Sequence, residues 1–410
     1  MDAKHTLGEP RVLISRSALL HNAALLRRFL RPGVRICAVL KADAYGHGAG
    51  IVTDALCNFS DGAHDTPAVD ALAVAGIDEA AALPDVRLPV LVLRPVENAF
   101  LGRQREKLEE AIRSGWVLTV CSQTAADDLA RIALACERRA AVQVMVDTGM
   151  TRSGVSPVHL PELLRKIESR PSLRLAGLCT HFSNAEEPGS SITIDQLNLF
   201  RDATDAFAAA YRGKVLRHAA NSGAIFFCSD AQFEMVRPGI SLYGIDPTCR
   251  PSIDRPLRPA LKWTAPLIAI DRVPKGTAVG YGQTWTAPRD THIGLLPVGY
   301  ADGYPRSFSN RAVVMVGGKP VPVVGRVSMD LTTIDLGETP TAQIGDEVTL
   351  LDTDPLSPAS VYALSQWAGT IPYEILCGIG PRVPRVAICP EDPDPPRHRS
   401  IIGSIPRDAS

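Results

Sequence analysis

The chain has 410 residues, which is too long for one ordinary core and predicts two domains. Its 43 Lys and Arg residues nearly balance its 44 Asp and Glu residues, so the charge indicates neither a nucleic-acid footprint nor a polybasic membrane anchor. No apolar run approaches the roughly 18 residues of a membrane helix, and the N-terminus lacks the apolar stretch of a signal peptide. The nine cysteines include no C-x-x-C pair, which favours reduced thiols over disulfides or a zinc site. We therefore expect a soluble cytoplasmic protein.

Between residues 34 and 240, short runs rich in Val, Ile and Leu alternate with segments of helical periodicity. The apolar runs span residues 34–40, 71–75, 90–93, 116–121, 141–146, 173–180, 216–220 and 235–240. Continuous apolar strands separated by helices predict a parallel sheet buried on both faces, and eight such strands are what a TIM-type (β/α)8 barrel needs. An open, doubly wound sheet is the alternative that this pattern leaves open.

The composition changes near residue 250, where segment 247–259 is rich in Pro and Arg and typical of a linker. Beyond it, short β-like runs separated by Gly and Pro, with one helical stretch at 358–367, predict a mostly β domain. These runs span residues 267–273, 291–297, 312–316, 321–327, 332–335 and 347–351. We expect a barrel over residues 11–250, a β-domain over 259–388 and a disordered, Pro-rich tail over 389–410.

Reactive side chains follow several of the predicted barrel strands, at the rim where such barrels carry their active sites. The first strand ends in Lys41, whose amine becomes nucleophilic when burial lowers its pKa. The fifth leads to Arg152, whose guanidinium fork suits a carboxylate, and the sixth to His181. The seventh and eighth carry Ser222 and Arg237, where barrels often bind phosphate. Taken singly, each residue is more often structural, but together they indicate a pyridoxal phosphate site.

The sequence resembles the alanine racemases, a family of fold-type III pyridoxal phosphate enzymes, from about residue 11 to residue 387. The resemblance rests on nine motifs in order: AVLKADAYGHG (38–48), VDTGMTRSGV (146–155), THFSNAEE (180–187), HAANSGA (218–224), VRPGISLYG (236–244), VGYGQTW (279–285), PVGYADGYPR (297–306), GRVSMD (325–330) and PYEILCGIGPRVPR (372–385). The motifs after residue 250 would be absent from a relative that consists of the barrel alone.

The resemblance implies a chemical role for four of the matching residues. Lys41 would hold the cofactor as a Schiff base, the internal aldimine, and act as the base toward D-alanine. Tyr281 of the partner subunit in a homodimer would act as the base toward L-alanine, on the opposite face of the aldimine. Because phenol ionises only near pH 10, the resemblance implies a link from Tyr281 through His181 to Arg237. Arg237 would also hydrogen-bond the pyridine nitrogen and leave it unprotonated, since arginine keeps its own proton.

The remaining matches concern binding. The residues implied to bind the cofactor are Lys41, Tyr45, Ser222, Arg237, Gly239, Ile240 and Tyr373. The substrate carboxylate would contact Arg152 and the backbone N–H of Met329. Tyr300 and Tyr373 would form a gate at the site entrance, although packing within the β-domain also explains Tyr300. No metal is implied.

One departure from the family pattern is Met145. Many members carry a lysine here that is carbamylated and orients the carboxylate-binding arginine, whereas a thioether has neither the charge nor that chemistry. Arg152 would then be oriented by a bound anion or be more mobile. A smaller departure is Glu186, where many members have aspartate at the outer entrance.

These matches imply an enzyme that interconverts L- and D-alanine, with two active sites shared across a homodimer. The alternatives are a racemase of serine or of several amino acids, a decarboxylase of the same fold, and a pyridoxal phosphate-binding protein without catalysis. The sequence does not decide between supplying D-alanine for peptidoglycan precursors and degrading alanine. No nucleic acid or membrane is implied as a partner.

Overall fold

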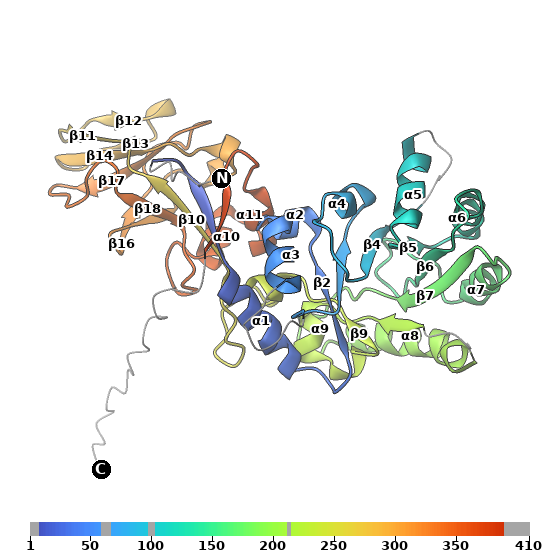
Figure 1. Ribbon diagram of the computed structural model, residues 1–410. Coiled ribbons are helices and arrows are strands. Elements are labelled where there is room, and N and C mark those ends of the chain that lie inside the picture. The colour runs from blue at the N-terminus through green and yellow to red at the C-terminus, as the bar shows by residue number, and fades with distance from the viewer. Residues whose placement is uncertain (1–7, 59–66, 97–102, 211–214, 389–410) are drawn as a thin grey trace, which may run out of the picture.

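The computed structural model describes residues 8–58, 67–96, 103–210 and 215–388. Eight parallel strands form its first sheet, in the order β8-β7-β6-β5-β4-β3-β2-β9 (Figure 1). They are β2 (Arg35–Val39), β3 (Ala71–Val74), β4 (Val90–Pro95), β5 (Val117–Val120), β6 (Ala140–Met145), β7 (Leu173–Cys179), β8 (Leu216–His218) and β9 (Met235–Val236). Each strand overlaps one of the eight predicted apolar runs, and the sheet curves into a nearly closed TIM-type barrel. The barrel prediction is therefore confirmed, and the open doubly wound sheet is wrong.

The barrel closes between β8 and β9 through individual hydrogen bonds instead of a continuous ladder. The N–H of Arg237 donates to the carbonyl of Ala220 over 2.8 Å, and the N–H of Glu234 donates to the carbonyl of Arg217 over 3.2 Å. Strand β9 is only two residues long. Pro238 comes soon after it and has no N–H to extend a ladder.

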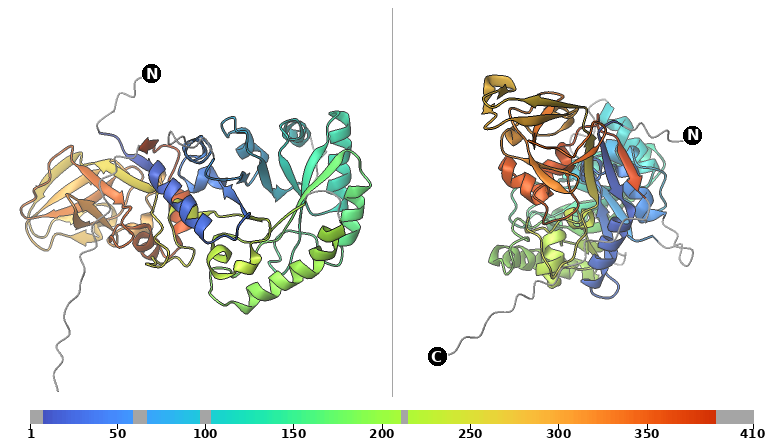
Figure 2. Two further views of the ribbon diagram at one scale, coloured as in Figure 1. Left: turned by 60° about the horizontal axis from the view of Figure 1, so that its bottom comes forward. Right: turned by 90° about the vertical axis from the view of Figure 1, so that its left-hand side faces the viewer.

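Helices connect the strands, and the longer ones cover the outside of the barrel (Figure 2). They are α1 (Arg16–Arg28), α2 (Lys41–Tyr45), α3 (Ala49–Cys57), α4 (Ile77–Ala81), α5 (Arg103–Arg113), α6 (Gln123–Ala135), α7 (Leu160–Glu168), α8 (Ser191–Ala210) and α9 (Ser222–Phe227). In α7, Leu160, Leu163, Leu164 and Ile167 are buried at the i, i+3, i+4 and i+7 positions of one helix face. None of the helices in the described ranges has the length and apolar character that a bilayer crossing requires.

The second part of the chain is mostly β, as predicted. Its sheets have the orders β16-β15-β18-β10-β1-β19, β11-β14-β17 and β12-β13. The strands are β1 (Arg11–Ser15), β10 (Leu261–Pro266), β11 (Ala269–Val273), β12 (Ala278–Val279), β13 (Trp285–Thr286), β14 (Thr291–Leu296), β15 (Val313–Val316), β16 (Lys319–Pro322), β17 (Thr332–Gly337), β18 (Glu347–Leu351) and β19 (Arg385–Ile388). Helices α10 (Val361–Ala368) and α11 (Pro372–Gly378) pack beside them.

The barrel does not start at residue 11 as expected, because the first strand belongs to another sheet. Strand β1 lies between β10 and β19 in the six-stranded sheet, antiparallel to β10 and parallel to β19. Ile14, for example, pairs with Leu261 on one side and with Ala387 on the other. The division of the chain near residue 250 stays a prediction, and the tail over 389–410 lies outside the described residues.

Candidate active site

Lys41 lies two residues after the end of β2, at the carboxyl end of the barrel strands, and begins the short helix α2. This turn is left-handed, because Ala42, Asp43, Ala44 and Tyr45 have φ values of 55°, 51°, 54° and 54°. A left-handed conformation costs residues other than glycine about 1–2 kcal/mol each. Such a turn persists only where its surroundings support it, and it is a frequent feature of functional sites.

The surroundings of Lys41 favour the neutral form of its amine. Loss of solvent around the amine lowers the pKa of Lys41, and the positive charges of Arg152 and Arg237 lower it further. Cys377 and Glu79 act in the opposite direction. A lysine with a lowered pKa serves as a nucleophile and as a base, which is the chemistry predicted for this residue.

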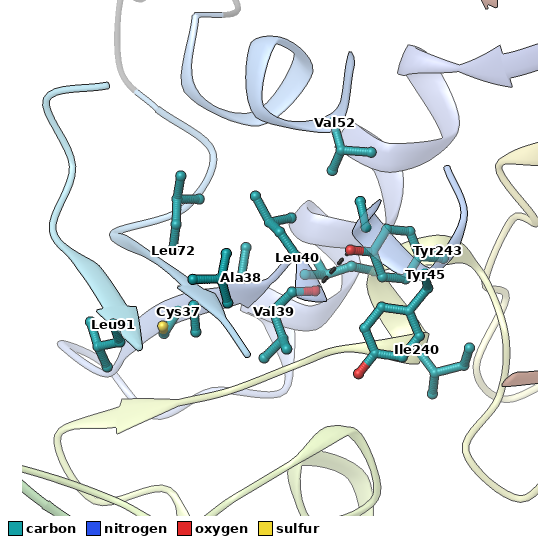
Figure 3. Packing of buried hydrophobic residues seen from close by; sticks show 14 of the residues in the cluster. Cys37, Ala38, Val39, Leu40, Tyr45, Val52, Leu72, Leu91, Ile240 and Tyr243 are labelled. Atoms are coloured by element: carbon teal, nitrogen blue, oxygen red, sulfur yellow. Dashed lines mark hydrogen bonds between the residues drawn. The ribbon is translucent and has the colours of Figure 1, made fainter. Parts of the chain in front are cut away.

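Tyr45, Ser222 and Gly239 form a buried cradle beside this turn. The Ser222 hydroxyl oxygen accepts hydrogen bonds from the N–H groups of Gly239 and Ser241, over 3.0 and 3.3 Å. A Cβ atom on Gly239 would lie 2.3 Å from the Tyr45 hydroxyl, so only glycine allows this approach. The Tyr45 ring lies beside Ile240 (Figure 3), and burial raises the pKa of Tyr45, which keeps its hydroxyl a neutral donor. Hydroxyls and backbone N–H groups that converge in this way suit a phosphate.

Aromatic contacts fix the position of Tyr45. Its ring centroid lies 4.9 Å from that of Tyr243, whose hydroxyl donates to the carbonyl of Val39 over 2.8 Å (Figure 3). On another side, the Tyr373 ring from α11 lies 6.1 Å away. The structure thus brings together five of the predicted cofactor contacts: Tyr45, Ser222, Gly239, Ile240 and Tyr373.

Arg237 is 5 % exposed, and uncharged groups hold its guanidinium. Its Nη1 donates to Nδ1 of His218 over 2.7 Å and to the His218 carbonyl over 2.6 Å. Its Nη2 donates to the carbonyl of Thr180 over 2.7 Å. Burial lowers the pKa of Arg237, although a guanidinium keeps its proton in proteins. The Nε–H group lies outside this set of hydrogen bonds.

The hydrogen bonds continue across the barrel interior in one direction. Because Arg237 can only donate, Nδ1 of His218 accepts, and the imidazole proton must sit on Nε2. This Nε2–H donates to the Gln143 side-chain oxygen over 3.1 Å, and the Gln143 amide donates to the Thr119 hydroxyl over 2.7 Å. Thr119 in turn donates to the carbonyl of Val92 over 2.6 Å. These hydrogen bonds are absent from the sequence predictions, although a Gln and a Thr inside otherwise apolar strands indicate buried polar contacts.

His181 lies on the other side of Arg237. Its Nδ1 is 3.5 Å from Nη2 of Arg237, so this nitrogen faces a donor and the proton belongs on Nε2. Burial lowers the pKa of His181 to about 3, and the charges of Arg237, Arg152 and Lys41 contribute. His181 is therefore a neutral imidazole that offers one N–H, and the predicted contact with Arg237 is present as a long one.

Arg152 lies exposed at the barrel mouth and lines a small cavity with Met145, Asp147 and His181. The Asp147 carboxylate accepts three N–H groups of its own loop, each over 3.0 Å, and so shapes the segment that carries Arg152. Met145 is 8 % exposed, and its sulfur lies 3.7 Å from Sγ of Cys179. An apolar thioether thus lies in the same cavity as Arg152, at the position for which the family resemblance implies a lysine.

Besides Tyr373, three predicted site residues lie on the C-terminal part. Tyr281 belongs to the turn η3 (Tyr281–Gln283) between β12 and β13, at the end of the molecule opposite the barrel (Figure 1). Its side chain is 73 % exposed, and that of Met329 is 54 % exposed. The N–H of Tyr300, also exposed, donates to the carbonyl of Ser328, which places Tyr300 beside Met329. Within a single chain, Tyr281 therefore does not lie near Lys41.

Family comparisons cover both parts of the chain. The family description "Alanine racemase, N-terminal domain" matches residues 14–247, and "Alanine racemase, C-terminal domain" matches residues 260–387. The alanine racemase of Chlorobaculum tepidum is 40 % identical over 92 % of this chain and 94 % of its own length. That of Sorangium cellulosum is 35 % identical over 92 % of this chain and 98 % of its own.

Solved structures agree with this result. The alanine racemase of Streptomyces coelicolor A3(2) is 36 % identical, with a TM-score of 0.82 over 94 % of this chain and 100 % of that chain. The alanine racemase of Bartonella henselae, described with covalently bound pyridoxal phosphate, is 29 % identical, with a TM-score of 0.76 over 93 % of this chain and 99 % of that chain. The similarity in three dimensions therefore includes the barrel and the β-domain together.

Proposed function

Because the chain belongs to the alanine racemase family, we propose that it interconverts L- and D-alanine with pyridoxal 5′-phosphate and two bases. The bases would be Lys41 of one subunit and Tyr281 of its partner in a homodimer. The observation that carries the proposal is the position of Lys41. The amine of Lys41 has a lowered pKa. The residue also begins a turn that leads into the buried cradle around Tyr45 and Gly239.

The residues present fit pyridoxal phosphate. Tyr45, Ser222, Gly239, Ile240 and Tyr373 would hold the phosphate through hydroxyls and backbone N–H groups. The remaining Nε–H of Arg237 would face the ring nitrogen and leave it unprotonated, while Lys41 would provide the amine for attachment. When bound, the cofactor supplies an electron-withdrawing ring that acidifies the α-proton of the amino acid.

The side chains divide the proton transfer between two faces of the substrate. The Lys41 amine would take the α-proton of D-alanine, and Tyr281 of the partner subunit that of L-alanine, each within about 3 Å of the proton's path. His181 supports this assignment because its free Nε2–H would donate to the partner's tyrosine and stabilise the phenolate. Arg152 and the N–H of Met329 would hold the substrate carboxylate.

The shared site gives a direct test of the homodimer. A hybrid dimer of one Lys41→Ala subunit and one Tyr281→Phe subunit would contain one intact site and one site without either base. We expect each variant alone to be nearly inactive and the purified hybrid, isolated with two affinity tags, to regain about half of the parent activity. A hybrid as inactive as its two parents would contradict a site shared between subunits.

The activity is tested by chiral separation of D-alanine from protein loaded with pyridoxal phosphate and incubated with L-alanine, with L-serine in parallel. We expect rapid approach to an equal mixture with alanine, little reaction with serine, and no reaction by Lys41→Ala. Equal rates for both amino acids would favour a broader racemase. Bound cofactor without racemisation of either would favour a binding protein.

The cellular role that we propose is supply of D-alanine for peptidoglycan precursors, in the cytoplasm. Growth of a bacterial strain without its own alanine racemase, in medium that lacks D-alanine, tests this role. Failure of the active enzyme to support growth there would favour a catabolic role.

A further inference from the structure

Arg385 lies at the start of β19 and contacts the carbonyls of two segments, the turn that follows Lys41 and residues 379–383 just after α11. Its Nε donates to the carbonyl of Gly46 over 3.0 Å, in the turn that follows Lys41. Its Nη1 donates to the carbonyls of Gly380 and Val383 over 2.5 and 2.7 Å, and its Nη2 donates to that of Ile379 over 2.6 Å. One half-buried guanidinium thus joins the C-terminal sheet to the barrel rim.

The two segments that Arg385 joins are packed backbone against backbone. Gly46 has a φ of 79°, and a Cβ atom on it would lie 2.1 Å from the carbonyl oxygen of Leu376 in α11. No side chain at residue 46 can therefore fill or strengthen this contact. The same helix α11 carries Tyr373, which lies beside Tyr45. The relative position of the turn and α11 consequently sets how Tyr45 and Tyr373 face each other.

The turn itself needs such support. Four consecutive residues, 42–45, have left-handed backbone conformations, which are costly without glycine. Internal hydrogen bonds help: the N–H of Gly46 donates to the carbonyl of Ala42 over 2.9 Å, and that of Gly48 to the carbonyl of Asp43 over 3.0 Å. These bonds lie within the turn, whereas Arg385 attaches its carboxyl end to a different part of the protein.

We propose that Arg385 is a positioning residue for the cofactor site, which holds the Lys41–Gly48 turn against α11 and so fixes Lys41 and Tyr45. Four carbonyls require a planar fork with several fixed donors, which a lysine ammonium cannot match from one point. The effect on the cofactor rests on the proposed function. The effect on the turn does not.

Hydrogen exchange of the cofactor-free protein, followed by mass spectrometry, tests the effect on the turn. In Arg385→Met, we expect the amides of residues 41–48 to exchange about tenfold faster or more, because hydrogen bonds from a charged donor are lost. Strand β6 (Ala140–Met145), in the same barrel, should exchange as before. Arg11→Met is the matched control: Arg11 precedes Val12, the register partner of Arg385, but its ion pair with Glu347 does not involve the turn.

The second measurement is the pyridoxal phosphate concentration that half-saturates the visible absorbance band of the bound cofactor. We expect it to rise about tenfold in Arg385→Met, less in Arg385→Lys, and not in Arg11→Met. Arg385→Gln replaces the Met variant if the latter does not fold.

Each other outcome has a distinct meaning. Equal exchange of residues 41–48 in Arg385→Met and Arg11→Met would overturn the proposal. Faster exchange of β6 as well would show a general stabilising role only, and would also overturn it. If the turn loosens while cofactor affinity stays the same, the link to the cofactor site is wrong. If the parent protein binds no cofactor but the turn loosens, the proposed function fails while the positioning of the turn stands.

Discussion

The guanidinium of Arg237 donates a hydrogen bond to Nδ1 of His218 over 2.7 Å, in a place where His218 is only 1 % exposed. A protonated His218 would turn this acceptor into a donor that faces another donor. Burial and the charge of Arg237 accordingly place the pKa of His218 well below its ordinary value. The cation at the centre of the site is thus stabilised by a histidine that must remain neutral.

This requirement predicts a loss of stability in mild acid. His47 is fully buried as well, and burial lowers its pKa to about 4. Below pH about 6.5 the unfolded chain takes up protons on His47, His218 and His181 that the folded chain does not, so the free energy of unfolding falls by about 1.4 kcal/mol per pH unit for each. Urea unfolding between pH 8 and pH 5 measures this slope.

Two variants test whether a buried histidine, and not an exposed one, causes this pH dependence of the free energy of unfolding. We expect His47→Asn to reduce the slope by about one proton, and His159→Asn, an exposed position, to leave it unchanged. An unchanged slope in His47→Asn would contradict the assignment.

The hydrogen-bond chain behind His218 predicts unequal effects of the same substitution at two buried threonines. Thr119 donates to the carbonyl of Val92 and accepts from Gln143, whereas the Thr53 hydroxyl has no hydrogen-bond partner among the described residues. Thr119→Val should therefore lower the free energy of unfolding by about 1–3 kcal/mol, since it leaves buried polar groups unpaired. Thr53→Val should be neutral or stabilising. Chemical denaturation measures the free energy of unfolding of both variants. Equal losses would show that the hydrogen bonds behind His218 add no stability.

Replacing Glu79 is expected to change the pKa of the Lys41 amine. Its carboxylate accepts the N–H of Ala42 over 2.9 Å and that of Ala75 over 2.6 Å, and its charge raises the pKa of the Lys41 amine. Glu79→Gln should lower that pKa, as measured by competitive acetylation of the cofactor-free protein and mass spectrometry of the Lys41 peptide. Asp78→Asn removes a charge from the same helix, where Asp78 pairs with Lys107, and should leave the pKa unchanged. A rise in Glu79→Gln would show that the turn opens to solvent instead.

The surroundings of Met145 predict that a lysine at this position would destabilise the protein. Met145→Lys would bury an ammonium beside a thiol and near Arg152, which should cost about 3–5 kcal/mol of stability. Bicarbonate should restore part of the loss if the new amine is carbamylated, because carbamylation reverses its charge. Met150→Lys, at a less buried position of the same cavity, is the control and should lose little. Thermal unfolding with and without bicarbonate decides, and an unchanged midpoint for Met145→Lys would contradict the expectation.

Much of the barrel could be predicted because each strand is buried on both faces and leaves an unbroken apolar run, as in β6, where all six residues are buried. The residues at the strand ends, such as Lys41 and Ser222, followed from that assignment. Strands β1, β10 and β19 could not be predicted, since Val12 pairs with Trp263 and Arg385, far away in the sequence. The chain through Gln143 was also missed, because which strand residues point inward depends on barrel closure.

The place of β1 has a consequence for synthesis. Among the described strands β1 is synthesised first, whereas its neighbour β10 follows only after all the barrel strands, and its other neighbour β19 comes last. At about 5–20 residues per second, roughly 250 residues and some 12–50 s separate β1 from β10. During that time the growing barrel would carry a strand whose backbone N–H and C=O groups have no sheet to join. A chain cut near residue 250 would give one piece with this orphan strand and another with a gap in its main sheet, so the gene tolerates division less well than the two-part shape implies.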